Sequence, residues 1–198
     1  MKVYKLAKKE KQEDDLEKMK EWFEKRTRMH IGLVQKYIKK IADYDDRFEE
    51  LIERNKLHDQ SKFEDPENEP YLYISWQYKC KDDGVDWEPP ENIKEKMSKA
   101  TEHHVKNNPH HPEFYSEEEV ALINREDRDK PPEKMVDGTK MKDVDIADMC
   151  GDWFGMSEER GTNPKEWADN NVNIRWKFTD SQKDLIYELI DKVWENNA

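Results

Sequence analysis

Apolar residues recur at helical spacing along a chain that is otherwise highly charged. In the segment 30–44, for example, Val34, Ile38 and Ile41 lie on one face of a helix. Similar stripes predict further helices, whose approximate ranges are 10–28, 45–57, 91–106, 145–156 and 180–195. Charged residues make up 41% of the chain, but seven Trp, eight Tyr and six Phe are enough to anchor a small core. The pattern predicts an all-α fold with a charged surface.

Other segments qualify this prediction. The aromatic stretch 71–78 could be a strand, but it is predicted as a helix because no partner strand is evident nearby. Ser116–Glu119 has the pattern of a capped start of a short helix. Polar, proline-containing stretches are predicted as loops at 64–70, 81–90 and 124–140. We expect one domain over 1–198, a helical bundle with polar loop insertions and a C-terminal packing helix over about 180–195.

The formal net charge of −12 argues against direct binding to nucleic-acid backbones. A small anionic substrate remains compatible with this charge, because a bound metal ion reverses the local sign. The two cysteines form no CxxC pair, no apolar run has the length of a membrane span, and the N-terminus lacks the apolar core of a signal peptide. We therefore expect a cytoplasmic protein without a membrane partner; the oligomeric state stays open.

All six histidines lie within the first 111 residues, and five of them adjoin another His or an Asp. They include His58–Asp59, the pair at 103–104 and the pair His110–His111. Taken singly, each could be a helix-end or loop residue. His104, however, continues the buried stripe of its helix, and a buried His needs a partner. Imidazoles and carboxylates are the usual ligands of Zn, Fe and Mn, so the clustering favours a metal site.

Carboxylates recur on one face of the predicted helix 145–156. Asp145, Asp148 and Asp152 are spaced three and four residues apart, which is costly without a counter-ion. Asp145 is also a natural N-terminal cap, whereas Asp152 lies deep in the helix. Lys62, three residues after Asp59, could offer charge to an anionic substrate or be a solvated surface residue.

The order His30, His58–Asp59 and a late Asp resembles that of the HD-domain superfamily of metal-dependent phosphohydrolases. The stretch 58–62, HDQSK, is similar to the HD-x-G-K motif of HD-GYP phosphodiesterases and myo-inositol oxygenase-like proteins. The resemblance implies an HD-domain-like helical bundle whose additional histidines bind a second metal, here His104 with His110 or His111. Ser61 departs from the usual Gly, and the loop 124–140 lengthens the spacing to the last Asp. We favour Asp152 as the ligand and keep Asp148 as the alternative or as a supporting residue.

The chain resembles more closely a family of small bacterial and phage proteins of unknown function. The segments that carry this resemblance are HDQSKF (58–63), EHHVKNNPHHPE (102–113) and DMCGDW (148–153). The resemblance covers about 30–153 and brings no known reaction with it. Together with the helix that ends near residue 156, it implies a metal-site core over about 30–156.

The resemblance implies hydrolysis of a nucleotide or another small phosphoester, with one or two divalent ions (Mn, Fe, Zn, Co or Mg). The first ion would be held by His30, His58, Asp59 and Asp152. A second ion, or the phosphate, would be held by His104, His110 and His111. Lys62 would neutralise developing charge, and Glu113 and Glu102 are candidate acid–base groups. Two alternatives stay open: a dinuclear iron oxygenase with the same ligands, and a non-enzymatic, phage-encoded protein-binding factor with a structural metal site.

Overall fold

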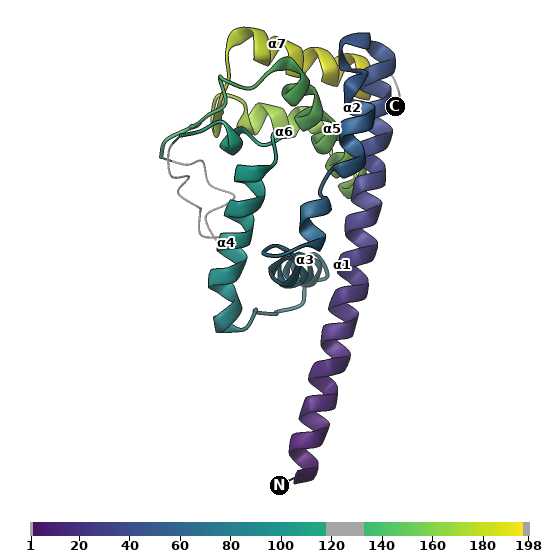
Figure 1. Cartoon of the computed structure of the whole chain (residues 1–198), viewed down its shortest axis with the longest axis vertical. Coiled ribbons are helices and arrows are strands. Elements are labelled where there is room, and N and C mark those ends of the chain that lie inside the picture. Colours follow the sequence, from purple (N-terminus) through teal and green to yellow (C-terminus); the bar gives the residue numbers. More distant parts are fainter. Residues whose placement is uncertain (1, 118–132, 196–198) are drawn as a thin grey trace.

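The computed structural model describes residues 2–117 and 133–195, with side chains from Asp15 onward. These residues form seven α-helices and a two-stranded sheet, so the predicted all-α class is confirmed (Figure 1). The helices are α1 (Lys2–Tyr44), α2 (Glu50–Arg54), α3 (Asn68–Asp82), α4 (Glu91–Asn107), α5 (Asp143–Arg160), α6 (Pro164–Asn171) and α7 (Asp180–Leu189). A π-helical turn, Ile190–Trp194, continues α7.

Helix α1 is continuous, although the sequence predicts two helices over about 10–28 and 30–44. The predicted interruption at Met29 is wrong. The sequence has no proline near Met29 that would break the helix. Gly32 lies inside the helix with open space around it and does not break it. The C-terminal half of α1 packs along α5, while its N-terminal turns extend beyond the rest of the described chain (Figure 1).

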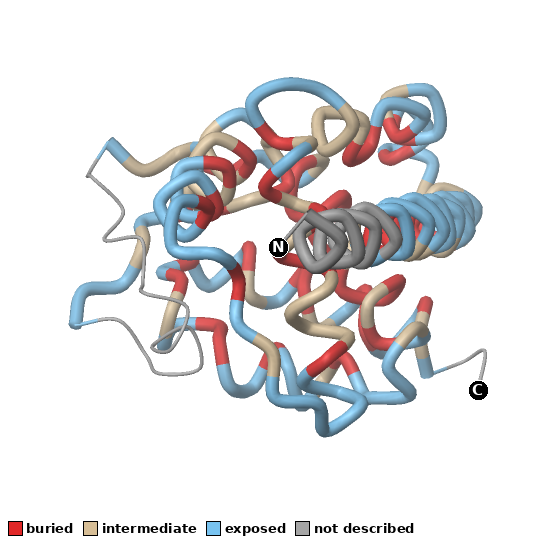
Figure 2. The backbone as a smooth tube through the Cα atoms, turned by 90° about the horizontal axis from the view of Figure 1, so that it is seen from below, coloured by how far each residue is buried: buried red, intermediate tan, exposed pale blue. Residues whose placement is uncertain are grey.

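The larger core lies where α1, α5 and α7 meet. Ile146 and Phe154 of α5 are buried in one cluster with Ile38 of α1. The two helices approach closely at Gly155, where an added Cβ would lie 2.9 Å from Cγ2 of Val34. Figure 2 shows that buried residues gather where the helices face one another. This close pairing fixes the carboxylate-bearing face of α5 relative to α1.

A smaller apolar cluster joins α3 to α4 through Ile74, Ile93 and Met97. The ambiguous segment 71–78 lies within α3, so its prediction as a helix is confirmed. Helix α3 also packs against α1, nearer the N-terminal end of α1 than α5 does (Figure 1). Helix α3 thereby lies against both α1 and α4.

Helix α5 begins two residues earlier than predicted. Asp145 is not its N-terminal cap, because the helix begins at Asp143 and Lys142 occupies the cap position. Asp145 lies in the first turn, where its Oδ1 is 2.6 Å from Nη1 of Arg54 and its Oδ2 accepts a hydrogen bond from the Tyr115 hydroxyl. Its carboxylate therefore binds two other segments instead of its own helix.

The C-terminal end of α5 also differs from the prediction. The helix continues past Met156 to Arg160, and Gly161 then ends it with a left-handed backbone (φ 63°). Helix α6 was not predicted. It begins at Pro164, capped by the side chain of Asn163, and is too short and polar to show an apolar stripe.

Three further segments differ from the prediction or escape it. The predicted helix over 45–57 is interrupted, because α2 is flanked by 3₁₀ turns on both sides. Strand β1 (Val136–Asp137) lies in the predicted loop and pairs in parallel with β2 (Trp176–Lys177). Two-residue strands are too short to show alternation. Most of the predicted helix from Ser116 lies outside the described residues. Among the described helices, none is both long and apolar enough to cross a membrane.

Candidate metal centre

Five imidazoles from separate parts of the chain gather in one place. His30 lies on α1, His58 follows α2, and His104 occupies the last turn of α4, with His110 and His111 in the loop beyond it. Neighbouring ring centroids are 4.3–5.8 Å apart along the path His30, His58, His110, His111, His104. The predicted histidines therefore form one continuous cluster.

Asp59 lies at the centre of this cluster. Its backbone is left-handed (φ 58°), a conformation that Asp tolerates better than most residues. Its Oδ2 lies 3.6 Å from Nε2 of His30 and 3.8 Å from Nε2 of His58. Its Oδ1 lies 3.2 Å from Nε2 of His104. The two oxygens of one buried carboxylate thus face two different groups of imidazoles.

The first group consists of His30, His58 and Asp59, whose ligand atoms lie within 4.8 Å of one another. Asp152 of α5 adds a second carboxylate. Its Oδ1 is 2.9 Å from Nε2 of His30 and 3.7 Å from Nε2 of His58. The close packing of α5 on α1 at the preceding residue, Gly151, brings this carboxylate to His30.

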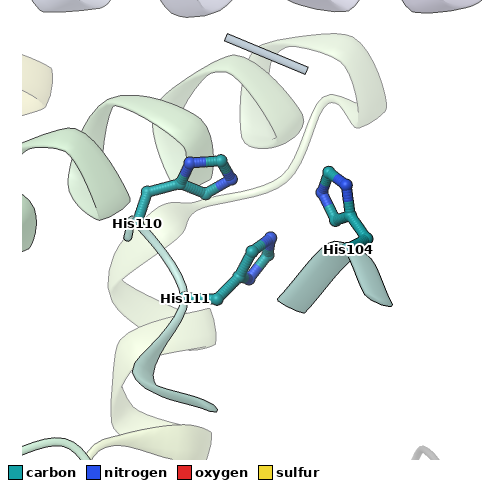
Figure 3. Close-up of side chains that lie close together, drawn as sticks. All are labelled: His104, His110 and His111. Atoms are coloured by element: carbon teal, nitrogen blue, oxygen red, sulfur yellow. The ribbon is translucent and has the colours of Figure 1, made fainter. Parts of the chain in front are cut away.

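The second group consists of His104, His110 and His111, whose ligand nitrogens also lie within 4.8 Å of one another. Figure 3 shows their rings around a common space, two from the loop and one from α4. Prolines on both sides of the His110–His111 pair prevent α4 from continuing, so the chain turns back toward His104. Asp59 borders this group through its Oδ1 atom.

The cluster keeps its carboxylates ionised. Burial alone would raise the pKa of Asp59, but the charges of Lys62, His58 and His104 hold it well below its usual range. Burial would likewise raise the pKa of Asp152, but the close contact with His30 and the charges of His30 and His58 lower it strongly. Both side chains are therefore carboxylates at neutral pH, which is the form that binds a cation.

The two loop histidines have the opposite character. Burial, with His111 and His58 nearby, holds the pKa of His110 well below its usual value. Burial and the charge of His104 lower the pKa of His111 to about 3. Both imidazoles are therefore neutral at neutral pH, and each keeps a nitrogen lone pair available for a ligand bond.

Several buried nitrogens of the cluster have no hydrogen-bond partner among the described residues. They include both ring nitrogens of His58 and Nε2 of His111. Leaving buried polar atoms unpaired is costly, and such groups are rare in folded proteins. Imidazole nitrogens and carboxylate oxygens are also the donor types that Zn, Mn, Fe and Co bind. The residues present therefore fit one or two divalent ions.

Residues 19–192 match the model of a family described as "Family of unknown function (DUF5662)". The chain belongs to this family. No curated protein and no solved structure matches the chain. The family match includes every residue of both imidazole groups and both central carboxylates.

Within the range of the family match, further carboxylates lie behind the imidazoles. Glu67, fully buried, accepts a hydrogen bond from Nδ1 of His104 at 2.9 Å. Oε2 of Glu159 lies 3.7 Å from Nδ1 of His30, and Arg26 binds Glu159 through Nε at 2.7 Å. The sequence analysis missed both glutamates. No spacing signal marks them, because each meets its histidine across a long stretch of chain.

Asp148 also lies close to His58, but both of its oxygens are bound by other protein groups. Nδ2 of Asn55 donates to Oδ1 at 2.8 Å, and Nη2 of Arg54 lies 3.3 Å from Oδ2. Asp148 also has a ligand oxygen within 4.8 Å of ligand nitrogens of His58 and His110. Burial raises its pKa, despite the positive charges of His58 and Arg54. Asp148 thus borders the cluster, whereas Asp152 lies directly beside His30.

The three predicted catalytic residues have different positions. The ammonium group of Lys62 contacts Oδ2 of Asp59, so this residue belongs to the cluster. Glu113 accepts a hydrogen bond from Nε1 of Trp176 at 2.9 Å. Glu102 lies on α4, and it forms no hydrogen bond or ion pair with another described residue. Only Lys62 is brought to the central carboxylate.

Proposed function

We propose that the chain is a metal-dependent phosphohydrolase of the HD-domain kind, acting on a nucleotide or another small phosphoester. The position of Asp59 carries this proposal, because one oxygen faces each of two imidazole groups. A carboxylate in that position can bind two ions at once. The order of the residues along the chain agrees with the HD-domain superfamily that the sequence resembles.

The proposed ligands divide into two sets that share Asp59. The first ion would be held by His30, His58, Asp59 and Asp152. A second would be held by Asp59, His104, His110 and His111. Asp152 is preferred to Asp148 because Asn55 and Arg54 already bind both oxygens of Asp148. Asp148 would instead support the cluster from outside.

Metal ions held in this way would lower the pKa of a bound water and polarise a phosphoryl oxygen. The protein itself would position the substrate and balance charge. Lys62 is 17% exposed, so its ammonium group can contact both Asp59 and an incoming phosphoryl oxygen. The chain is acidic elsewhere, with a net charge of −12, which favours a small phosphoester over a nucleic acid.

The proposal is tested by metal analysis and turnover on the same sample. Protein purified without a His tag would be analysed for bound metals, then assayed with p-nitrophenyl phosphate, its bis ester and a panel of nucleotides. We expect bound divalent metal, together with hydrolysis that a chelator abolishes and Mn²⁺ restores. Asp152→Asn should abolish turnover, whereas the same change at the exposed Asp43 should leave it intact.

Other results would replace the proposal. Bound iron with oxygen-dependent turnover of a non-phosphorylated substrate would favour the dinuclear oxygenase. Stoichiometric metal without turnover, combined with unfolding on chelation, would favour a protein-binding factor with a structural metal site. Protein that takes up no divalent metal would refute both enzyme hypotheses.

A further inference from the structure

We propose that Glu67 is the positioning residue of the second metal site, and that it directs the Nε2 lone pair of His104 toward Asp59. This inference rests on the proposed function, because it assigns a role within the same site. The sequence places Glu67 in a polar stretch between two prolines, 66 and 70, with no sign of a role. In the structure its carboxylate is fully buried and receives hydrogen bonds from three side chains.

The carboxylate of Glu67 points away from the helix that it precedes. Glu67 occupies the N-terminal cap position of α3, where a carboxylate would ordinarily bind the first backbone N–H groups. It forms no such cap bond and instead contacts α4. Oε2 accepts from Nδ1 of His104 at 2.9 Å, and Oε1 accepts from Nδ1 of His103 at 2.7 Å. A buried carboxylate is thus held between two successive imidazoles.

The competing contacts of His104 identify the donor in this arrangement. Ser61 Oγ lies 3.4 Å from Nδ1 of His104, and Nδ2 of Asn108 lies 3.2 Å from it. Both groups have shorter bonds elsewhere: Ser61 donates to Glu67 at 3.0 Å, and Asn108 donates to the His104 carbonyl at 2.8 Å. The shortest contact of Nδ1, to the charged acceptor, is therefore the one in which Nδ1 donates its proton.

A proton on Nδ1 fixes the role of the opposite nitrogen. In the neutral ring Nε2 then carries a lone pair, and it lies 3.2 Å from Oδ1 of Asp59. Two lone pairs at that separation repel each other unless a proton or a cation lies between them. A carboxylate that binds the far nitrogen of a ligating histidine also increases the basicity of the ligating nitrogen. Glu67 therefore prepares His104 and Asp59 to share one cation.

Ser61 gives this arrangement a link to the HDQSK segment. It occupies the position where the resembling HD-x-G-K motif has glycine, and a glycine has no hydroxyl to donate. Its Oγ binds the same oxygen of Glu67 that accepts from His104, so it fixes the carboxylate from the side of Asp59. The departure from the motif and the buried glutamate are thus parts of one hydrogen-bonded unit.

The experiment measures two metal-binding constants in the full-length protein. Mn²⁺ would be titrated against a competing chelator, and the visible spectrum of Co²⁺ would report the coordination of each ion. In Glu67→Gln we expect the second binding step to weaken by about 10–100-fold while the first is unchanged. Ser61→Ala, which removes one of three donors, should weaken the same step by a smaller factor and provides a test if Glu67→Gln fails to fold.

The matched control is His103→Gln. His103 is 40% exposed and binds the other oxygen of Glu67, so its loss should leave both binding constants unchanged. Three results would overturn the proposal: an unaltered second step in both Glu67→Gln and Ser61→Ala, equal weakening in His103→Gln, or uptake of a single ion by the wild type. Two-step binding that responds to Glu67→Gln, without any phosphoester turnover, would support this role and refute only the hydrolase.

Discussion

Replacing Asp59 with Asn tests the centre of the site with little change of shape. Asn tolerates the left-handed backbone at this position (φ 58°), whereas Ala would add about 1–2 kcal/mol of strain. The change removes the negative charge that Lys62, His30, His58 and His104 all face. Because a direct ligand is lost, we expect metal affinity to fall by more than the roughly 10–100-fold typical of outer groups.

The metal-free protein should survive this change. Removing one partner of a buried ion pair costs about 3–5 kcal/mol when the other charge stays buried. Here Lys62 is partly exposed and can reach water, and the imidazoles can become neutral by losing a proton. We therefore expect a loss of about 1–3 kcal/mol in the free energy of unfolding, within the range for a lost buried hydrogen-bond partner.

The assay combines urea unfolding in chelator with elemental analysis of the same preparations. Asp43→Asn is the matched control, because Asp43 is exposed and its ion pair is with Lys39, one turn away on the same helix. It should keep wild-type metal content and stability. Full metal occupancy in Asp59→Asn would refute the assignment of the site. Loss of metal together with failure of Asp59→Asn to fold, with the control folded, would instead make the site structural.

Four further substitutions test other parts of the reasoning. Asp152→Asn should remove bound metal. Asp148→Asn should mainly lower the unfolding free energy, by about 1–3 kcal/mol, because Asn55 and Arg54 lose a charged acceptor. Elemental analysis and urea unfolding of both variants distinguish the two effects, and the reverse result would exchange the roles of the two aspartates. His111, with its pKa lowered to about 3, stays neutral in the fold but binds a proton when unfolded below about pH 6.5, so acid destabilises the metal-free protein. In His111→Gln this loss should be smaller by up to about 1.4 kcal/mol per pH unit between about pH 6 and pH 4 in urea unfolding, and parallel pH profiles would contradict the assignment. Gly155→Ala should destabilise by about 1–2 kcal/mol, because its Cβ would meet the side chain and backbone of α1; a gain in melting temperature would refute the close-packing argument.

The sequence predicted the elements that carry an apolar stripe and missed those that do not. Helices α4 and α7 begin within a residue or two of their predicted starts, because prolines and capping residues mark them. The interruption predicted at Met29 was wrong, because the sequence has no helix-breaking proline there and α1 runs through it. Helix α6 and the short sheet were missed because their stability comes from tertiary contacts, such as Trp153 stacking on Trp176, and not from local pattern.

The histidines of the cluster could be selected from the sequence, because five of the six adjoin another His or an Asp. What the sequence could not show is the geometry that distinguishes one carboxylate from another. Asp148 and Asp152 are one turn apart on the same face, yet only one adjoins His30. Glu67 and Glu159 had no local signal at all, because their partners are tens of residues away.

The charge balance around the cluster decides how an anionic substrate could bind. Buried or half-buried carboxylates outnumber the lysine and arginine side chains that pair with them: Asp59, Asp145, Asp148, Asp152, Glu67 and Glu159 stand against Lys62, Arg26 and Arg54. The neutral imidazoles of His110 and His111 do not offset this excess. A phosphate group entering the metal-free cluster would therefore meet net negative charge, which repels it. Divalent ions reverse the local sign. Under the proposed function we therefore expect metal to bind before the phosphoester, and the metal-free protein to bind phosphate only weakly.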